Sequence, residues 1–110
     1  MDGMMHKRRW VDACDVSHIP ARGARRLVVP HGEIGVFKAQ DGALYAIDNQ
    51  CPHKKGPLTE GIVHDTAVTC PLHNWVIDLQ SGRARGADEG CVRTYPVELR
   101  GDRVFIDIGE

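Results

Sequence analysis

Two short segments, Cys51-Pro52-His53 and Cys70-Pro71-Leu72-His73, most constrain what this chain can fold into. Each offers one thiol and one imidazole, and 16 residues separate His53 from Cys70. A chain of 110 residues buries a limited core, so a centre that ties two loops together would add stability. We therefore expect a fold that brings these two segments to one place.

Three chemistries can use this set of side chains. Zinc takes two thiolates and two imidazoles in a closed tetrahedral site. A disulfide between Cys51 and Cys70 would leave the histidines incidental. A [2Fe-2S] cluster can have one iron held by the two cysteines and the other by His53 and His73. Familiar Cys2His2 zinc fingers place both cysteines together and then both histidines, whereas each segment here supplies one of each, which favours the cluster.

The rest of the sequence is typical of an all-β domain. Short segments rich in Val, Ile and Leu alternate with Gly and Pro, and helical periodicity is nowhere sustained. Gln40-Asp41-Gly42 and Arg100-Gly101-Asp102 predict the turns of two hairpins. In the last strand Val104, Ile106 and Ile108 share one face because side chains alternate along a strand. Strands are expected over 10–14, 25–29, 33–39, 43–49, 93–99 and 103–108.

The length indicates one domain, which we place at 10–110 behind a flexible tail at 1–9. The segment 50–90 is expected to be a loop-rich subdomain that carries both Cys/His segments. No secretory signal or membrane span is evident, so we expect a cytoplasmic protein in which Cys14 and Cys91 are buried free thiols. The formal charge of −1 favours neither nucleic acid nor an anionic membrane as a partner.

The pattern C-x-H, sixteen residues, C-x-x-H resembles the motif of Rieske iron–sulfur proteins. The wider stretches "CPHKKGPLTEGIV" and "CPLHNWVIDLQSGRA" resemble the small subunit of assimilatory NAD(P)H-dependent nitrite reductase, and the similarity runs on through "YPVELRGDRVFID". The resemblance implies a Rieske-type domain of stacked antiparallel sheets. It also implies a [2Fe-2S] cluster with Cys51 and Cys70 on the inner iron and His53 and His73 on the solvent-facing iron.

The same resemblance implies a role in electron transfer to a larger partner. In that family the large subunit carries FAD, a [4Fe-4S] cluster and sirohaem, and it reduces nitrite to ammonium with NAD(P)H. A cluster with four protein ligands has no open position for substrate, and the chain has no nucleophile motif or dinucleotide fingerprint. We therefore expect no catalytic residues in this chain, which would be the non-substrate-binding component of the enzyme.

The sequence departs from the high-potential Rieske proteins of respiratory complexes. Gly56 and Leu72 stand where those proteins carry two further cysteines joined in a disulfide. Trp75 and Ile77 stand where they carry a serine and a tyrosine that donate hydrogen bonds to the cluster. Fewer donors stabilise the reduced cluster less, so we expect a reduction potential toward the low end of the Rieske range.

Two other functions remain open at this point. A Rieske ferredoxin that donates electrons to an aromatic-ring-hydroxylating oxygenase has the same cluster and a similar length. A zinc-stabilised binding module without redox function would use the same four side chains.

Overall fold

The predicted all-β fold is confirmed. The computed structural model describes residues 8–50, 56–71, 75–85 and 90–109, and these form ten short strands and two 3₁₀ turns. In chain order the elements are β1 Trp10–Asp15, η1 Val16–His18, β2 Ala24–Val29, β3 Gly32–Lys38, β4 Leu44–Asp48, η2 Leu58–Glu60, β5 Ile62–His64, β6 Ala67–Thr69, β7 Val76–Asp78, β8 Thr94–Tyr95, β9 Val97–Arg100 and β10 Arg103–Asp107.

Both predicted hairpins are present. Strands β3 and β4 pair antiparallel across the Gln40–Gly42 turn, and β9 and β10 pair antiparallel across Gly101-Asp102. Gly42 and Gly101 have φ values of +88° and +60°. This left-handed region penalises residues with a Cβ, which explains why both turns carry glycine.

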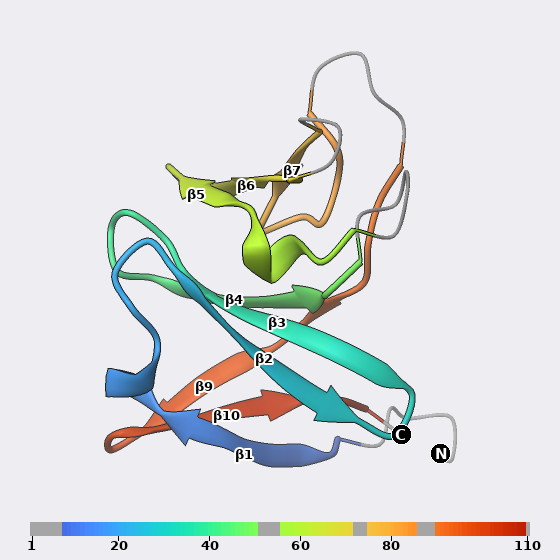
Figure 1. Cartoon of the computed structure of the whole chain (residues 1–110). Helices are drawn as coiled ribbons and strands as arrows, with labels where there is room; N and C mark the ends of the chain where they lie inside the picture. Colours follow the sequence, from blue (N-terminus) through green and yellow to red (C-terminus); the bar gives the residue numbers. More distant parts are fainter. Residues whose placement is uncertain (1–7, 51–55, 72–74, 86–89, 110) are drawn as a thin grey trace.

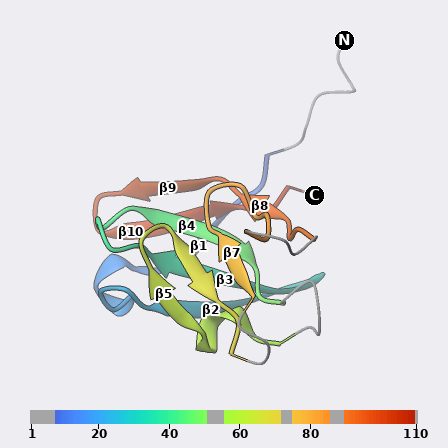
Figure 2. The same ribbon diagram turned by 90° about the horizontal axis from the view of Figure 1, so that it is seen from above.

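The strands form three antiparallel sheets stacked as layers (Figure 1). One sheet has the order β1-β10-β9, the central sheet β2-β3-β4-β8, and the third β5-β6-β7. The view from above shows the small third sheet lying over the central one (Figure 2). The third sheet follows the first Cys/His segment in the chain and contains the second between β6 and β7.

The central sheet packs against a core on each face. On β3, Ile34 and Val36 enter a first core shared with β1 and β10, whereas Phe37 enters a second core beneath the third sheet. Val104, Ile106 and Ile108 lie in the first core, as their alternation predicts, and each is at most 3% exposed. Side chains of one strand alternate between faces, so a single strand supplies both cores.

The segment 50–90 contains more regular structure than a loop-rich insertion. Its strands β5, β6 and β7 are three residues each and pair through Val63↔Val68 and Val68↔Ile77. At the other end of the domain, the backbone N–H of Arg9 donates to the Asp107 carboxylate. The division into a tail at 1–9, a domain at 10–110 and a cluster-binding subdomain at about 50–90 stays a prediction.

Candidate metal centre

Of the four predicted ligands, the structure describes Cys70. Cys51, His53 and His73 lie outside the described residues, as do Lys54 and Lys55. Cys70 directly follows β6, its side chain is 0% exposed, and its backbone N–H donates to the carbonyl oxygen of Trp75 at 2.7 Å. This bond joins the residue after β6 to the residue before β7.

Cys70 has the surroundings of a buried ligand. It belongs to the second core together with Leu58, Ile77 and Leu79, and Trp75 packs against the same cluster. Its thiol is free, and the other described cysteines, Cys14 and Cys91, are free as well. A thiol held among apolar side chains at the end of a strand suits the soft thiolate ligation of an iron–sulfur centre.

The backbone brings the chain after the first Cys/His segment against the chain before the second. Gly61 closes η2, and a Cβ at this position would overlap the carbonyl oxygen of Thr69, the residue before Cys70. Ile62 pairs with Thr69 in the next step of the sheet. Leu58, which is 0% exposed, lies in the same core as Cys70. The fold therefore places the chain that follows the first segment against the strand that precedes Cys70.

A hydrogen-bonded chain that the sequence analysis missed leads toward the first segment. The buried Tyr95 hydroxyl donates to the Asp48 carboxylate at 2.5 Å and lies 3.0 Å from His31 Nε2. Because the tyrosine proton goes to Asp48, His31 donates its Nε2–H to the tyrosine oxygen. Burial and the neighbouring Asp48 carboxylate raise the pKa of Tyr95 far above its ordinary value. Asp48 precedes Cys51 by three residues.

The other cysteines differ from each other. Cys14 is buried in the first core, as predicted, and burial raises the pKa of its thiol. The prediction for Cys91 is wrong, because its side chain is exposed. Cys91 forms an isolated bridge with Arg83 and belongs to neither core, so no packed layer covers it.

The described histidines make contacts that their spacing in the sequence does not reveal. His64 Nε2 lies 2.7 Å from the Thr69 hydroxyl, across the β5–β6 pair. His18 ends η1 and is exposed. Within the described residues no group of three His, Cys, Asp or Glu side chains can hold a metal ion. The predicted ligands Cys51, His53 and His73 lie outside these residues, so the four-ligand set stays a prediction.

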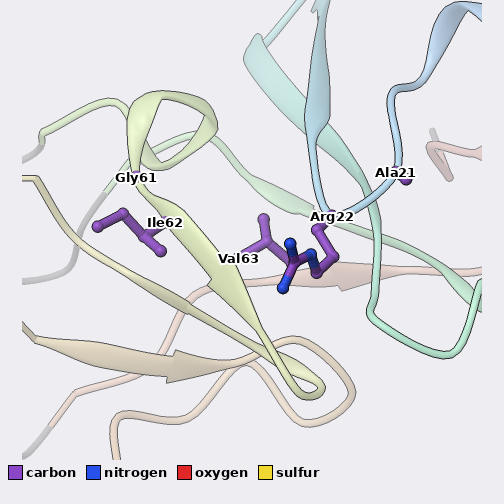
Figure 3. A pocket seen from close by; sticks show the side chains of 5 residues that line it. All are labelled: Ala21, Arg22, Gly61, Ile62 and Val63. Carbon is purple, nitrogen blue, oxygen red and sulfur yellow. The ribbon is translucent and has the colours of Figure 1, made fainter.

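Two grooves are lined by described residues of the surface. One groove of about 400 Å³ separates the loop before β2 from β5, and Figure 3 shows the Arg22 side chain extending toward Val63. Among the described residues that line it, Ala21, Arg22, Gly61, Ile62 and Val63, Arg22 is the charged one. A second groove is lined by Gln40, Asp41, Asp65 and Thr66. No helix in the described parts of the chain has the length and apolar character to cross a membrane.

Comparison with known proteins identifies the family. Residues 9–107 match the Rieske-like [2Fe-2S] domain. The chain is 33% identical over 101 residues to the ferredoxin component of the naphthalene 1,2-dioxygenase system of Pseudomonas aeruginosa, covering 91% of this chain and 96% of that protein. It is 35% identical over 100 residues to the 3-phenylpropionate/cinnamic acid dioxygenase ferredoxin subunit of Escherichia coli, covering 89% and 92%.

A solved structure shows the same fold. The Mycobacterium tuberculosis protein described as an NADH-dependent nitrite reductase small subunit superposes with a TM-score of 0.82 at 22% identity. The match covers 91% of this chain and 95% of that one, so both consist of the same three-layered unit. The chain therefore belongs to the Rieske-like [2Fe-2S] domain family and is an electron-transfer domain.

Proposed function

We propose that this chain is the electron-transfer small subunit of an assimilatory nitrite reductase and that Cys51, His53, Cys70 and His73 hold its [2Fe-2S] cluster. When bound, such a cluster supplies one-electron transfer without an open position for substrate. The observation that carries the ligand assignment is Cys70, a free thiol that is 0% exposed. It directly follows β6, and the last residue of that strand, Thr69, lies against Gly61 in the chain after the first ligand segment.

The choice of enzyme rests on the two ligand-bearing stretches. "CPHKKGPLTEGIV" and "CPLHNWVIDLQSGRA" carry the resemblance to nitrite reductase small subunits. Within them, the described residues build η2, the start of β5 and the whole of β7, and β6 lies between the two stretches. The likeness in fold to the M. tuberculosis protein, over 95% of its length, is consistent with this choice.

On this proposal the catalytic centre lies on another subunit. The large subunit would carry FAD, a [4Fe-4S] cluster and sirohaem and reduce nitrite to ammonium with NAD(P)H in the cytoplasm. This chain would relay electrons or complete the assembly without binding nitrite, nucleic acid or membrane. Its own residues hold and shield the cluster: the apolar second core excludes water from the Cys70 side.

The ligand assignment is tested by serine substitutions with two matched controls. Cys70→Ser should abolish the Rieske electron paramagnetic resonance (EPR) signal and the bound iron and acid-labile sulfide. Cys14→Ser changes a cysteine that is also buried, and Cys91→Ser an exposed one, and both proteins should keep their iron and their spectrum. An unchanged spectrum in Cys70→Ser, or zinc in place of iron in the unmodified protein, would refute the assignment.

A Rieske ferredoxin of an aromatic-ring-hydroxylating oxygenase is the second candidate function. The observation that favours it is the 33% and 35% identity to dioxygenase ferredoxins over about 100 residues of similar length. Such a ferredoxin would carry the same cluster on the same four ligands. The two proposals therefore differ in the partner and agree on the site.

The partner is tested by deletion and reconstitution. A strain of the source organism that lacks this chain should fail to grow on nitrite as sole nitrogen source, and the wild-type chain should restore growth whereas Cys70→Ser should not. The purified complex should show nitrite-dependent NAD(P)H oxidation and contain flavin and sirohaem. Normal growth on nitrite together with lost oxidation of an aromatic substrate would instead establish the ferredoxin function.

A further inference from the structure

The buried side chain of Asn49 connects the residues before the segment that contains Cys51 and His53 to the residues after it. Asn49 is 3% exposed, and it extends the β3–β4 ladder because its backbone N–H donates to the carbonyl oxygen of Glu33 at 3.0 Å. Its side chain then turns toward η2, the 3₁₀ turn that follows the ligand segment.

Both ends of the Asn49 amide are satisfied. Its Oδ1 accepts the backbone N–H of Thr59 at 2.8 Å, and its Nδ2 donates to the Glu33 carboxylate at 3.2 Å. Because a backbone N–H can only donate, the contact with Thr59 fixes which end of the amide is oxygen. Asn49 thus joins the residue two before Cys51 to a residue six after His53.

The Thr59 N–H lacks an acceptor on its own turn. The first N–H groups of a helical turn have no partner within it and are normally capped by the residue at the N-cap. Here the N-cap is Pro57, which makes no side-chain capping bond. The Asn49 side chain supplies that cap from across the ligand segment.

A close approach between η2 and the central sheet supports the same connection between Asn49 and Thr59. A Cβ on Gly35 would lie 2.7 Å from Thr59 Cγ2 and 2.6 Å from the Phe37 ring. The missing side chain lets Thr59 lie directly on β3, beside the Asn49 and Glu33 pair. Two independent features of the sequence therefore fix the same residue of η2 against the sheet.

We propose that Asn49 is a positioning residue for the cluster: its side-chain amide, held by Glu33 and capping Thr59, fixes the spacing between the two ends of the segment that bears Cys51 and His53. The proposal rests on the ligand assignment proposed above. It goes beyond that assignment because it names a residue outside the ligand set on which cluster retention depends.

The test uses an isosteric exchange and its rescue. Asn49→Asp keeps an acceptor for Thr59 but turns a carboxylate oxygen toward Glu33. It should speed cluster loss, followed by the bleaching of visible absorbance in the intact protein, about tenfold, the equivalent of one buried hydrogen bond. Glu33→Gln keeps an acceptor for Asn49 and should stay within about twofold of wild type. When both substitutions are combined, the new amide donates to the new carboxylate, so cluster lifetime should return to within about twofold.

Two further readouts separate positioning from general destabilisation. Amide exchange of residues 56–61, measured by mass spectrometry on the cluster-loaded protein, should rise about tenfold in Asn49→Asp and recover in the double variant. The EPR g-values should shift in the single variant and return in the double. The matched control is Asp107→Asn, at the end of β10. Like Asn49, Asp107 is buried and its side-chain oxygen accepts from the backbone, here from the N–H groups of Arg9 and Gly109. It should lower the melting temperature while leaving all three readouts unchanged.

The outcomes distinguish the two proposals. If wild type binds no iron–sulfur cluster, both the ligand assignment and the role of Asn49 are overturned. If wild type holds the cluster but Asn49→Asp loses it no faster than Asp107→Asn, or the double variant is not rescued, the positioning role alone is wrong. Should Asn49→Asp not fold, Glu33→Ala removes the acceptor of Asn49 Nδ2 together with an exposed ion pair to Arg26 at 3.8 Å. An exposed ion pair contributes little, so cluster loss about threefold faster than wild type is then expected from the lost acceptor. A wild-type lifetime in that variant would overturn the proposal.

Discussion

Removing one hydroxyl, in Tyr95→Phe, tests the network that supports the strand before the first ligand segment. The ring stays packed in the first core. The central carbon of the Arg93 guanidinium lies 4.7 Å from the centroid of this ring. What is lost is the bond to the Asp48 carboxylate and the bond from His31. A hydrogen bond to a charged acceptor contributes about 1.5–3 kcal/mol, and the bond from the exposed His31 adds about 0.5 kcal/mol.

We therefore expect Tyr95→Phe to lower the free energy of unfolding by about 2–3 kcal/mol. For a domain of this size the melting temperature should fall by about 10–20 °C. Urea unfolding followed by circular dichroism measures the change. His31→Ala removes the outer bond and the ring contact with Tyr95, whose centroids lie 6.1 Å apart, and it should cost less than about 1 kcal/mol. A melting temperature for Tyr95→Phe within about 3 °C of wild type (roughly half a kcal/mol) would refute this account of the network.

The same variant has a pH signature. Folding raises the pKa of Tyr95 through burial and the adjacent Asp48 carboxylate, so the folded state keeps the phenol proton above about pH 10, where the unfolded state releases it. The stability from this group is complete below about pH 10 and falls by about 1.4 kcal/mol per pH unit above it. The advantage of wild type over Tyr95→Phe should thus shrink by about 1 kcal/mol between about pH 10 and 11, because the unfolded tyrosine is only half ionised at its ordinary pKa. An advantage that stays constant over this range would contradict the assigned environment.

Three further substitutions probe the joint between the sheets and the ends of the chain. Gly61→Ala forces a Cβ onto the Thr69 carbonyl beside Cys70, and we expect a loss of about 3 kcal/mol in urea unfolding together with lower iron content per chain. Leu58→Ala empties a fully buried site in the second core and should cost about 2–5 kcal/mol, measured the same way. The N–H groups of Arg9 and Gly109 hold the pKa of Asp107 below its usual range, so its contribution to stability is present above about pH 4 and is lost as the pH falls further. Asp107→Asn should flatten that acid dependence in thermal melts between about pH 2.5 and 6, and an unchanged slope would show that other carboxylates cause it.

Much of the fold follows from local sequence signals. Gly42 and Gly101 occupy left-handed positions that few other residues tolerate, so each marks its hairpin without reference to the rest of the chain. The alternation of Val104, Ile106 and Ile108 extends over enough residues to identify the buried face of β10. These features depend on contacts between near neighbours, which is why the sequence predicts them.

What the sequence did not predict depends on the order of the strands. The strands β5, β6 and β7 have three residues each, too few for a period of two to be recognised. The partners Tyr95 and His31 are 64 residues apart and meet because β8 joins the sheet that β2 and β3 begin. Cys91 has the apolar character of a core residue, and only the sheet layout shows that it lies outside both cores.

The double-sided central sheet explains how a domain this small can anchor the residues at either end of the first ligand segment. In β4, Ala46 faces the first core and Ile47 the second, and the strand then runs into Asp48 and Asn49, which are both bound by groups of other elements. The first ligand segment thus starts from a strand packed on both faces, and it ends at a turn bonded back to that strand. Most of the binding free energy of a cluster can then go to ligation, because little chain entropy remains to be lost at the base of the segment. In a domain with the same four ligands on a sheet packed on one face only, cluster binding would also have to order the residues at the two ends of the first ligand segment.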